Sequence, residues 1–401
     1  MTETRLAPAS NARVLSIDIL RGLTVALMIV VNDPGDWQQV YPALQHAEWN
    51  GYTAADLIFP NFLFLAGASL VFSLETRVRR ANGLGISKLP IARALGRRAV
   101  NLIALQLFLA ALPSFRMRRI RIFGVLSRTA FCSLAGGLIL LVTLSLRTLL
   151  AVVAAILTGY WLTLRFVPIP GLGRPVHDQP LLDPDNNLAA WLDRKVAHVF
   201  HGELHTGALF NVTHDPEGLL SSAPALATLL LGACAALLMR SPRYTPETKR
   251  TLLALAGVSS LTAGHAWHRS LPINKNLWTS SYVLASAGWS LLALSTLYWL
   301  YDLKRIQQTS RVANMLSRPA NIFGANALVA YAASVAMHKI TRFIHLQHEG
   351  HSISLRTYAY RKTYARGRST PLRSLAFAVT YAAVCFLPNL LLWRKKILVK
   401  F

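Results

Sequence analysis

Residues 219–239 read LLSSAPALATLLLGACAALLM, a stretch without a single charged side chain. The hydrocarbon core of a bilayer is about 30 Å thick, and roughly 20 apolar residues in helical form cross it. This stretch has that length and character, and so do residues 277–300 and 372–393. The pattern predicts membrane-spanning helices.

The whole chain has the composition of a membrane protein. Of its 401 residues, 53% are hydrophobic and only 15% are charged, which is far from the balance of a soluble domain. We expect an all-α, polytopic transmembrane bundle of about ten helices, in a single domain covering 1–401, with a flexible N-terminus at 1–12 and a long loop at 168–218. The expected spans are 15–32, 56–75, 95–113, 123–146, 148–167, 219–239, 251–268, 277–300, 319–340 and 372–393.

The formal net charge of +25 is interpreted as a signal of orientation, not of nucleic-acid binding. Cytoplasmic loops of membrane proteins carry an excess of Lys and Arg. With both termini cytoplasmic, four basic segments lie inside: 76–94, 240–250, 301–318 and 393–401.

The outer side then holds residues 33–55, which contain no Lys or Arg, and the loop at 168–218, in which acids outnumber bases. Two basic segments, 114–122 and 341–371, also fall on this side and contradict the rule. Because no added lumenal domain is evident, we expect the inner membrane of a bacterium, with lipid as a partner.

The sequence gives no metal signature. Cys132, Cys234 and Cys385 fall within predicted spans and are interpreted as buried apolar side chains, not as a disulfide set or a zinc site. Two sets of three histidines, one with the spacing of a helix face and one in a predicted loop, are interpreted as polar surface. They are His198, His201 and His205, and His345, His348 and His351. We therefore expect no metal site.

Ionisable groups inside predicted spans are costly and are therefore candidates for function. Asp18 and Arg21 stand three residues apart, so they can pair on one helix face, as a structural ion pair or as part of a site. Asp56 opens the second span in the run ADLIFP, where a helix-capping role competes with a functional one.

The connection between the first two spans holds Asn32 and the run HAEWNG at 46–51. An imidazole can take the proton of an attacking amine at neutral pH, which N-acylation of an amino group requires. His46 is therefore a candidate base, although histidine is also common at hydrated helix ends.

These motifs, in this order, resemble the heparan-alpha-glucosaminide N-acetyltransferase family. The matching blocks are RVLSIDILRG (13–22), VN (31–32), HAEWNG (46–51), ADLIFP (55–60), GVLSR (124–128), VPIPG (167–171), DPEG (215–218), PINKNLW (272–278), Asn326 and RKK (394–396). The resemblance implies an enzyme that takes the acetyl group of cytosolic acetyl-CoA and delivers it to a glucosamine-type amine beyond the membrane. It also implies His46 as the active histidine, Asn32 beside it, and a homodimer.

Two routes fit these residues. His46 acts as general base on the sugar ammonium, or it becomes transiently acetylated as a nucleophile. Asn32, Asn274 and Asn276 are candidate hydrogen-bond donors to the thioester oxygen. The family has an aromatic and glycine run where this chain has Asp33 and Pro34.

Further residues are candidates for binding. Asp215 and Glu217 suit the cationic amine of the acceptor, whereas Lys275 and Arg128 suit phosphates or sugar hydroxyls, or structural ion pairs at helix ends. Trp49 and Trp278 suit stacking on a sugar or on adenine, or an interfacial aromatic belt.

Two other functions fit the same sequence. A transporter of a small polar solute would use Asp18, Arg21 and Asp56 as a polar pathway. A sugar or lipid O-acyltransferase would transfer the acyl group to a hydroxyl instead of an amine.

Overall fold

The computed structural model describes residues 14–116, 120–204, 207–211, 213–348 and 350–399. The N-terminal segment 1–12 lies outside the described residues. Within them, eight helices are long and apolar enough to cross a membrane, so the predicted all-α polytopic bundle is confirmed. They are α1 (Leu15–Asn32), α2 (Ile58–Leu84), α3 (Leu89–Ala111), α4 (Val125–Val142), α5 (Leu146–Phe166), α7 (Ser222–Arg240), α9 (Ser280–Leu297) and α14 (Pro371–Arg394).

The predicted span at 319–340 differs from the structure in shape. Helix α11 (Arg311–Ala325) and helix α12 (Ala327–Phe343) have the length and composition of one span together, but they are bent by 81°. The break falls at Asn326, whose side-chain amide donates to the carbonyl of Ile397 and whose side-chain oxygen accepts from the amide of Val399. The C-terminal segment therefore covers the break.

The predicted span at 251–268 is a helix, α8 (Pro246–Trp267), but it falls outside the set of apolar spans. It packs along α9 through small residues. A side chain at Gly264 would come within 2.8 Å of the Ser281 carbonyl oxygen, and one at Gly288 within 2.8 Å of the Gly257 carbonyl oxygen. Such close approach of two backbones is typical of membrane helix pairs.

The remaining elements are short, apart from the amphipathic helix α6 (Leu188–Leu204) in the long loop. There are two 3-10 turns, η1 (Pro42–Leu44) and η2 (Ala55–Leu57). A π-helical turn, η4 (Tyr298–Leu303), follows α9. A second π-helical turn, η5 (Arg361–Ala365), follows the short helix α13 (Leu355–Tyr360). A short helix α10 (Ile306–Thr309) precedes α11. Strands β1 (His345–His348) and β2 (His351–Ser354) form an antiparallel hairpin in which His348 lies opposite His351.

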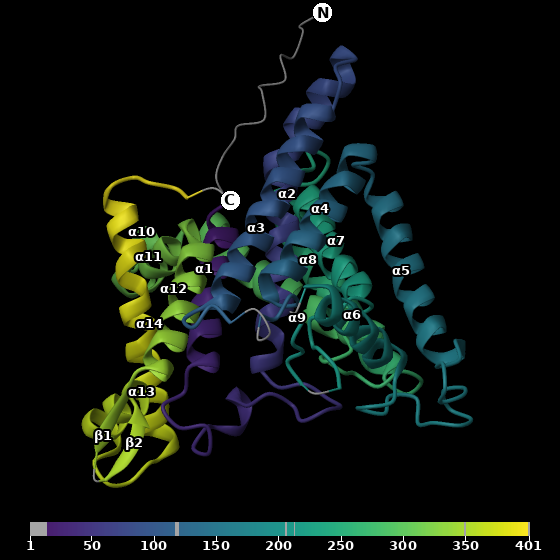
Figure 1. Cartoon of the computed structure of the whole chain (residues 1–401). Helices are drawn as coiled ribbons and strands as arrows, with labels where there is room; N and C mark the ends of the chain where they lie inside the picture. Colours follow the sequence, from purple (N-terminus) through teal and green to yellow (C-terminus); the bar gives the residue numbers. More distant parts are fainter. Residues whose placement is uncertain (1–13, 117–119, 205–206, 212, 349, 400–401) are drawn as a thin grey trace, which may run out of the picture.

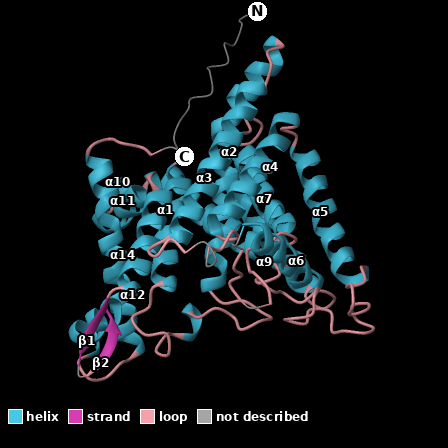
Figure 2. Cartoon of the chain, viewed as in Figure 1, coloured by secondary structure: helices cyan, strands magenta, loops and turns pink. Residues whose placement is uncertain are grey.

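The bundle has two distinct ends. Figure 1 shows the α2–α3 connection and α10 at the upper end, with the hairpin, α6 and the segment after α1 at the lower end. Loops gather mainly at the lower end (Figure 2). Cys132, Cys234 and Cys385 are buried with free thiols, which confirms their interpretation as buried apolar side chains. The lower end is where the site residues meet.

Helices α2 and α7 form the centre of the bundle through reciprocal glycines. A Cβ at Gly67 would stand 1.8 Å from the Leu229 carbonyl oxygen, and one at Gly232 would stand 1.8 Å from the Phe64 carbonyl oxygen. Neither backbone oxygen can move without shifting a whole helix, so these two positions hold the two axes close together.

Replacing Gly232 with alanine should therefore destabilise the protein by about 1–3 kcal/mol or more, since overpacking forces the backbone apart. Thermal unfolding in detergent measures the effect. Gly159→Ala is the matched control, because nothing lies within 4 Å of a Cβ there. Equal melting temperatures for the two variants would contradict this account of the α2–α7 contact.

Candidate active site

His46 lies in the loop between η1 and η2, beside the first residues of the α2 span. Its Nδ1 is 2.8 Å from Oδ1 of Asp56. In the tautomer that donates to Asp56, the proton is on Nδ1, because a carboxylate only accepts hydrogen bonds. The other ring nitrogen, Nε2, then keeps its lone pair, which is the form that can accept a proton.

Asp56 is fully buried, and its second oxygen is also occupied. Oδ2 accepts from the backbone amides of Ala47 and Thr53, both at 3.0 Å. The loop that carries His46 therefore folds around this carboxylate. For Asp56, a structural role and a functional role are compatible, because the same carboxylate orders the loop and orients the His46 imidazole.

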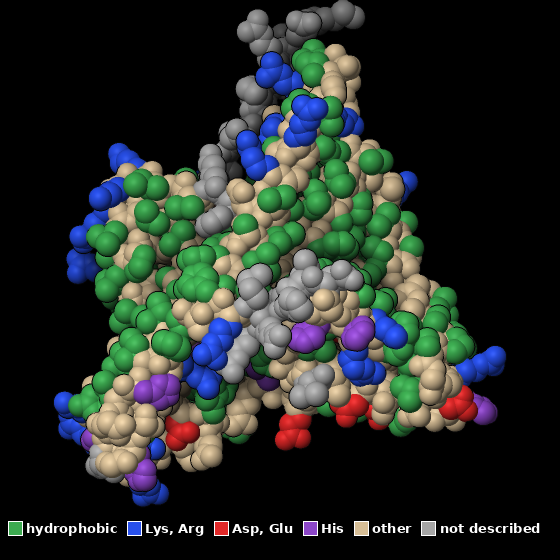
Figure 3. Space-filling view, viewed as in Figure 1, with side chains coloured by type: hydrophobic (Ala, Val, Ile, Leu, Met, Phe, Trp, Pro, Cys, Tyr) green, Lys and Arg blue, Asp and Glu red, His purple; other side chains and the backbone are tan. Residues whose placement is uncertain are grey.

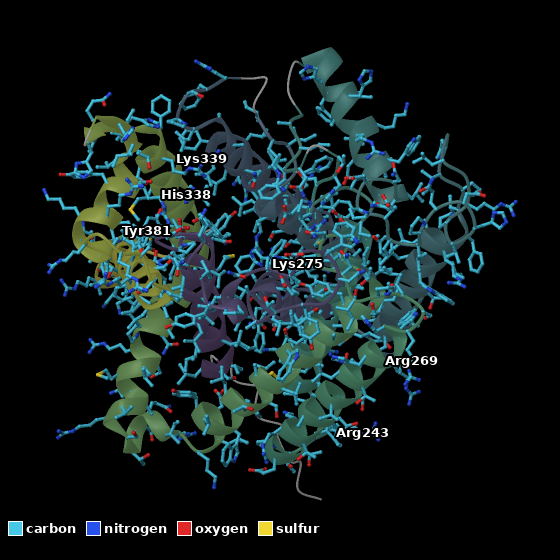
Figure 4. All side chains as sticks on the ribbon, turned by 90° about the horizontal axis from the view of Figure 1, so that it is seen from below. Arg243, Arg269, Lys275, His338, Lys339 and Tyr381 are labelled. Atoms are coloured by element: carbon cyan, nitrogen blue, oxygen red, sulfur yellow. The ribbon has the colours of Figure 1, made fainter. Side chains whose placement is uncertain are left out.

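Lys275 approaches the same pair from the turn before α9. Its Nζ is 3.0 Å from Asp56 Oδ1 and 3.0 Å from His46 Nδ1. The His46 side chain is 40% exposed, whereas that of Asp56 is 1% exposed. An accessible base therefore rests on a buried carboxylate whose charge Lys275 balances (Figure 4, where Lys275 lies near the middle of the bundle).

Asn274 connects the two halves of this site. Its side-chain amide donates to Asn50 at 3.3 Å, and its side-chain oxygen accepts from the Leu277 amide at 2.9 Å. The amide of Gly51 donates to the carbonyl of Ile273 at 2.7 Å. Asn274 thus fixes the HAEWNG loop against the start of α9, while Asn276 is half-buried in the same turn.

Asn32 is exposed at the end of α1, and within the described residues it makes no hydrogen bond to His46. Its neighbour Asp33 is buried instead. The Asp33 carboxylate lies 2.6 Å from Nδ1 of His338 and 3.2 Å from the guanidinium of Arg356. The role of Asn32 stays a prediction.

Trp278 has a structural environment. It is 1% exposed, packs edge to face on Phe59 and Tyr282, and donates to the hydroxyl of Thr228 at 3.1 Å. Trp49 is partly buried and donates to the Leu182 carbonyl at 2.8 Å. Stacking of either ring on a ligand stays a prediction.

Arg128 is buried against the Trp278 ring, at 4.9 Å. It donates to the carbonyl of Gly218 at 3.2 Å and to the Ser221 hydroxyl. Within the described structure, its Nε and Nη1 atoms have no hydrogen-bond partner. Its contacts join α4 to the segment before α7.

Asp215 and Glu217 already have a cationic partner. Arg121 donates to both carboxylates, including a 2.7 Å bond from its Nε to Asp215. Burial would lower the pKa of Arg121, but Glu217 and Asp215 raise it above its ordinary value. Capture of an acceptor amine by these acids stays a prediction. The pairing also gives Arg121, in the basic segment 114–122, two acidic partners.

Arg21 lines a cavity of about 200 Å³, and Asp18 is its ion-pair partner. Arg21 donates to Asp18 at 2.6 Å, to the Gly324 carbonyl at 2.7 Å and to Ser69 at 3.3 Å. We call this space the arginine cavity; its lining includes Arg21, Ser69, Arg98, Thr129, Asn326 and Val399.

The arginine cavity starts close to the His46 site. Along α2, Phe62 of the lining lies six residues after Asp56 and Ser69 lies thirteen after it. At 1.5 Å per residue these separations are about 9 Å and about 20 Å along the helix axis. The part of the lining that α2 supplies therefore begins on the Asp56 side of this helix and extends away from it.

Sequence reasoning missed several contributors. Arg98 lies inside the predicted span 95–113. An ionisable residue in a span is a candidate for function, so the sequence could have indicated it. Tyr282 donates to the backbone carbonyl of Asp56, and His338 and Arg356 join Asp33. Nothing in the local pattern around Tyr282, His338 or Arg356 indicates these distant partners.

The described residues contain no group of three or more His, Cys, Asp or Glu placed to hold a metal ion. His198 and His201 lie on α6, while His205 lies outside the described residues.

Comparison with known proteins agrees with the motifs. Residues 13–178 match the family model described as "Heparan-alpha-glucosaminide N-acetyltransferase, catalytic". The human heparan-alpha-glucosaminide N-acetyltransferase is 28% identical over 335 residues, which cover 73% of this chain and 49% of the human protein. The mouse protein is 29% identical over 353 residues, covering 75% and 51%. The chain spans about half the length of these relatives, and the predicted family resemblance is confirmed.

The pH dependence of stability tests the packing of the DPEG segment on α6. Asp193 is buried and accepts from the amides of Leu219 and Asp215, at 3.0 and 3.3 Å. Burial raises its pKa to about 6, from 3.8 in the unfolded chain. The folded protein then binds more protons than the unfolded chain between these values, so stability falls as pH rises through this window, by up to about 3 kcal/mol.

Asp193→Asn should remove this penalty. The melting temperature of the variant minus that of the wild type should increase between pH 4 and pH 7. A difference that stays constant over this range would show that Asp193 does not titrate there.

Proposed function

We propose that this chain, a relative of the heparan-alpha-glucosaminide N-acetyltransferase family, transfers the acetyl group of acetyl-CoA to the amino group of a glucosamine-type sugar. The observation that carries the proposal is the half-exposed His46 imidazole, held by a buried carboxylate at the end of the bundle. The names of the human and mouse relatives support the transfer of an acetyl group to an amino sugar.

His46 Nε2 accepts the proton of the sugar ammonium, which frees the amine to attack the thioester carbonyl. The new C–N bond forms, the C–S bond breaks, and the CoA thiolate leaves with a proton. Asp56 holds the ring in the required tautomer, as buried carboxylates do beside other catalytic histidines. Transient acetylation of His46 is the alternative route with the same residues.

The donor would reach His46 through the arginine cavity. CoA carries several phosphates, and Arg98 and Arg21 supply positive charge along the wall of this cavity. Asp18 already compensates Arg21 in part, so Arg98 is the better candidate for phosphate contact. The thiol arm would then extend past Phe62 toward the His46 end.

The proposed orientation rests on the distribution of basic segments along the chain. We place the basic α2–α3 connection, α10 and the C-terminal segment in the cytoplasm, with His46 facing the outer compartment, and we propose residues 1–401 as one transmembrane domain of a bacterial inner membrane. Acetyl-CoA then enters from the cytoplasm, and the sugar arrives outside. A homodimer remains part of this proposal.

The first test uses purified protein in detergent with radiolabelled acetyl-CoA and either glucosamine or glucose. Label should enter glucosamine and not glucose. Label on glucose instead would favour an O-acyltransferase, and CoA binding without label on any amino sugar would refute the N-acetyltransferase.

His46→Ala should lower turnover by about 10²- to 10⁴-fold, the range of a lost general base. His177→Ala is the control, because that histidine lies in an outer loop with an 85% exposed side chain. Full activity of the His46 variant would exclude both routes through this imidazole.

Arg98→Gln should raise KM for acetyl-CoA by about fivefold to tenfold and leave KM for the sugar unchanged. The reason is loss of one charge–phosphate contact at the donor end. Arg97→Gln provides a matched control, since Arg97 is exposed and does not line the cavity. The same KM shift in both variants would contradict donor binding in the arginine cavity.

A further inference from the structure

A second cavity, of about 1120 Å³, lies beside the β1–β2 hairpin at the same end of the bundle as His46. We call it the hairpin pocket. The segment 34–38, the end of α12, α13 and η5 form its walls. Figure 3 shows Lys, Arg and His side chains around the corner of the molecule that holds this hairpin.

The pocket is strongly basic. Its lining includes Arg342, Arg356, Arg361, Lys362 and Arg366. Within the described residues, the only carboxylate in this lining is that of Asp36, and it accepts from the backbone amide of Gln38.

Three of the arginines are uncompensated. Among the described residues, no carboxylate forms an ion pair with Arg342, Arg361 or Arg366. Arg356 differs, because it pairs with Asp33 and packs on the rings of Phe377 and Tyr381. Arg356 therefore has a structural role in the pocket wall. Arg342, Arg361 and Arg366 are available to bind an anion.

The backbone is strained at one of these arginines, Arg366. Arg366 has φ 39° and ψ 54°, the left-handed region that side chains other than glycine rarely adopt. It ends the π-helical turn η5, and such turns occur often at functional sites. Strain of this kind persists where the surrounding structure imposes it, and it is concentrated at ligand sites.

The pocket borders a surface suited to hydrocarbon. Phe343 and Ile344 at the end of α12 are 59% and 41% exposed, and Leu372 at the start of α14 is 66% exposed. Trp37 in the pocket wall is 57% exposed, as is typical of tryptophan at a membrane interface. An anion here would have apolar protein surface directly beside it.

We propose that the hairpin pocket binds the phosphate-bearing head group of an anionic lipid in the leaflet on the His46 side, with its acyl chains along the exposed ends of α12 and α14. Arginine suits phosphate because its planar guanidinium donates two parallel hydrogen bonds. The proposal also explains why segment 341–371 is basic on a side where the positive-inside rule expects few such residues. It does not depend on the proposed acetyl transfer.

The test measures lipid binding to the purified full chain in neutral detergent, by native mass spectrometry with phosphatidylglycerol and phosphatidylcholine. Phosphatidylglycerol should bind more tightly. Arg342→Gln and Arg361→Gln should each weaken its binding by about fivefold, the value for one charge near an anionic surface.

Arg368→Gln is the matched control, because Arg368 is exposed in the same basic segment and lies outside the lining. It should bind phosphatidylglycerol like the wild type. Arg361→Lys keeps the charge but not the paired donors, so its affinity should lie between those of the wild type and Arg361→Gln. Melting temperatures would confirm that each variant is folded.

Three outcomes would overturn the proposal. An equal loss in Arg368→Gln would indicate general surface attraction. Equal binding of phosphatidylcholine would remove the need for an anionic head group. Inorganic phosphate could also compete with bound phosphatidylglycerol. If phosphate displaced it at a concentration as low as that at which phosphatidylglycerol itself binds, the site would be one for free phosphate and not for a lipid.

Discussion

The buried carboxylate of Asp56 is the group on which the His46 end of the structure depends. An ionised carboxylate is costly to bury unless it is paired and hydrogen-bonded. Here the backbone of the 46–53 loop, the His46 imidazole and the Lys275 ammonium all satisfy it, and Tyr282 binds the backbone carbonyl of the same residue. The cost of burying one charge therefore determines the path of a loop, the tautomer of a histidine and the contact between α2 and α9.

The same requirement recurs at two arginines of this end of the bundle. Arg121 is balanced by Asp215 and Glu217, and Arg356 by Asp33. Both basic segments that contradict the positive-inside rule thus contain an arginine engaged by acids on the same side. The positive-inside rule counts Lys and Arg and gives Asp and Glu little weight, so it does not register these ion pairs.

Hydropathy was sufficient to predict the bundle and most of its spans, because length and apolar composition determine whether a helix can cross a bilayer. It did not predict the 81° break at Asn326, since averaging over a window hides a single polar residue that binds a distant segment. In the candidate site, His46, Asp56 and Lys275 were all singled out, but their mutual contacts were not. His338 and Asp33 are separated by 305 positions, and no local pattern indicates such a pair.

The aromatic cluster of Phe59, Trp278 and Tyr282 has a consequence for the hydration of the bundle. Phe59 lies on α2 between Asp56 and Phe62. Trp278 packs edge to face on Phe59 from the turn before α9, and Tyr282 of α9 packs edge to face on Trp278. Three rings packed edge to face fill this region with apolar surface. Apolar rings bind water weakly, so their packing limits hydration along this part of the bundle.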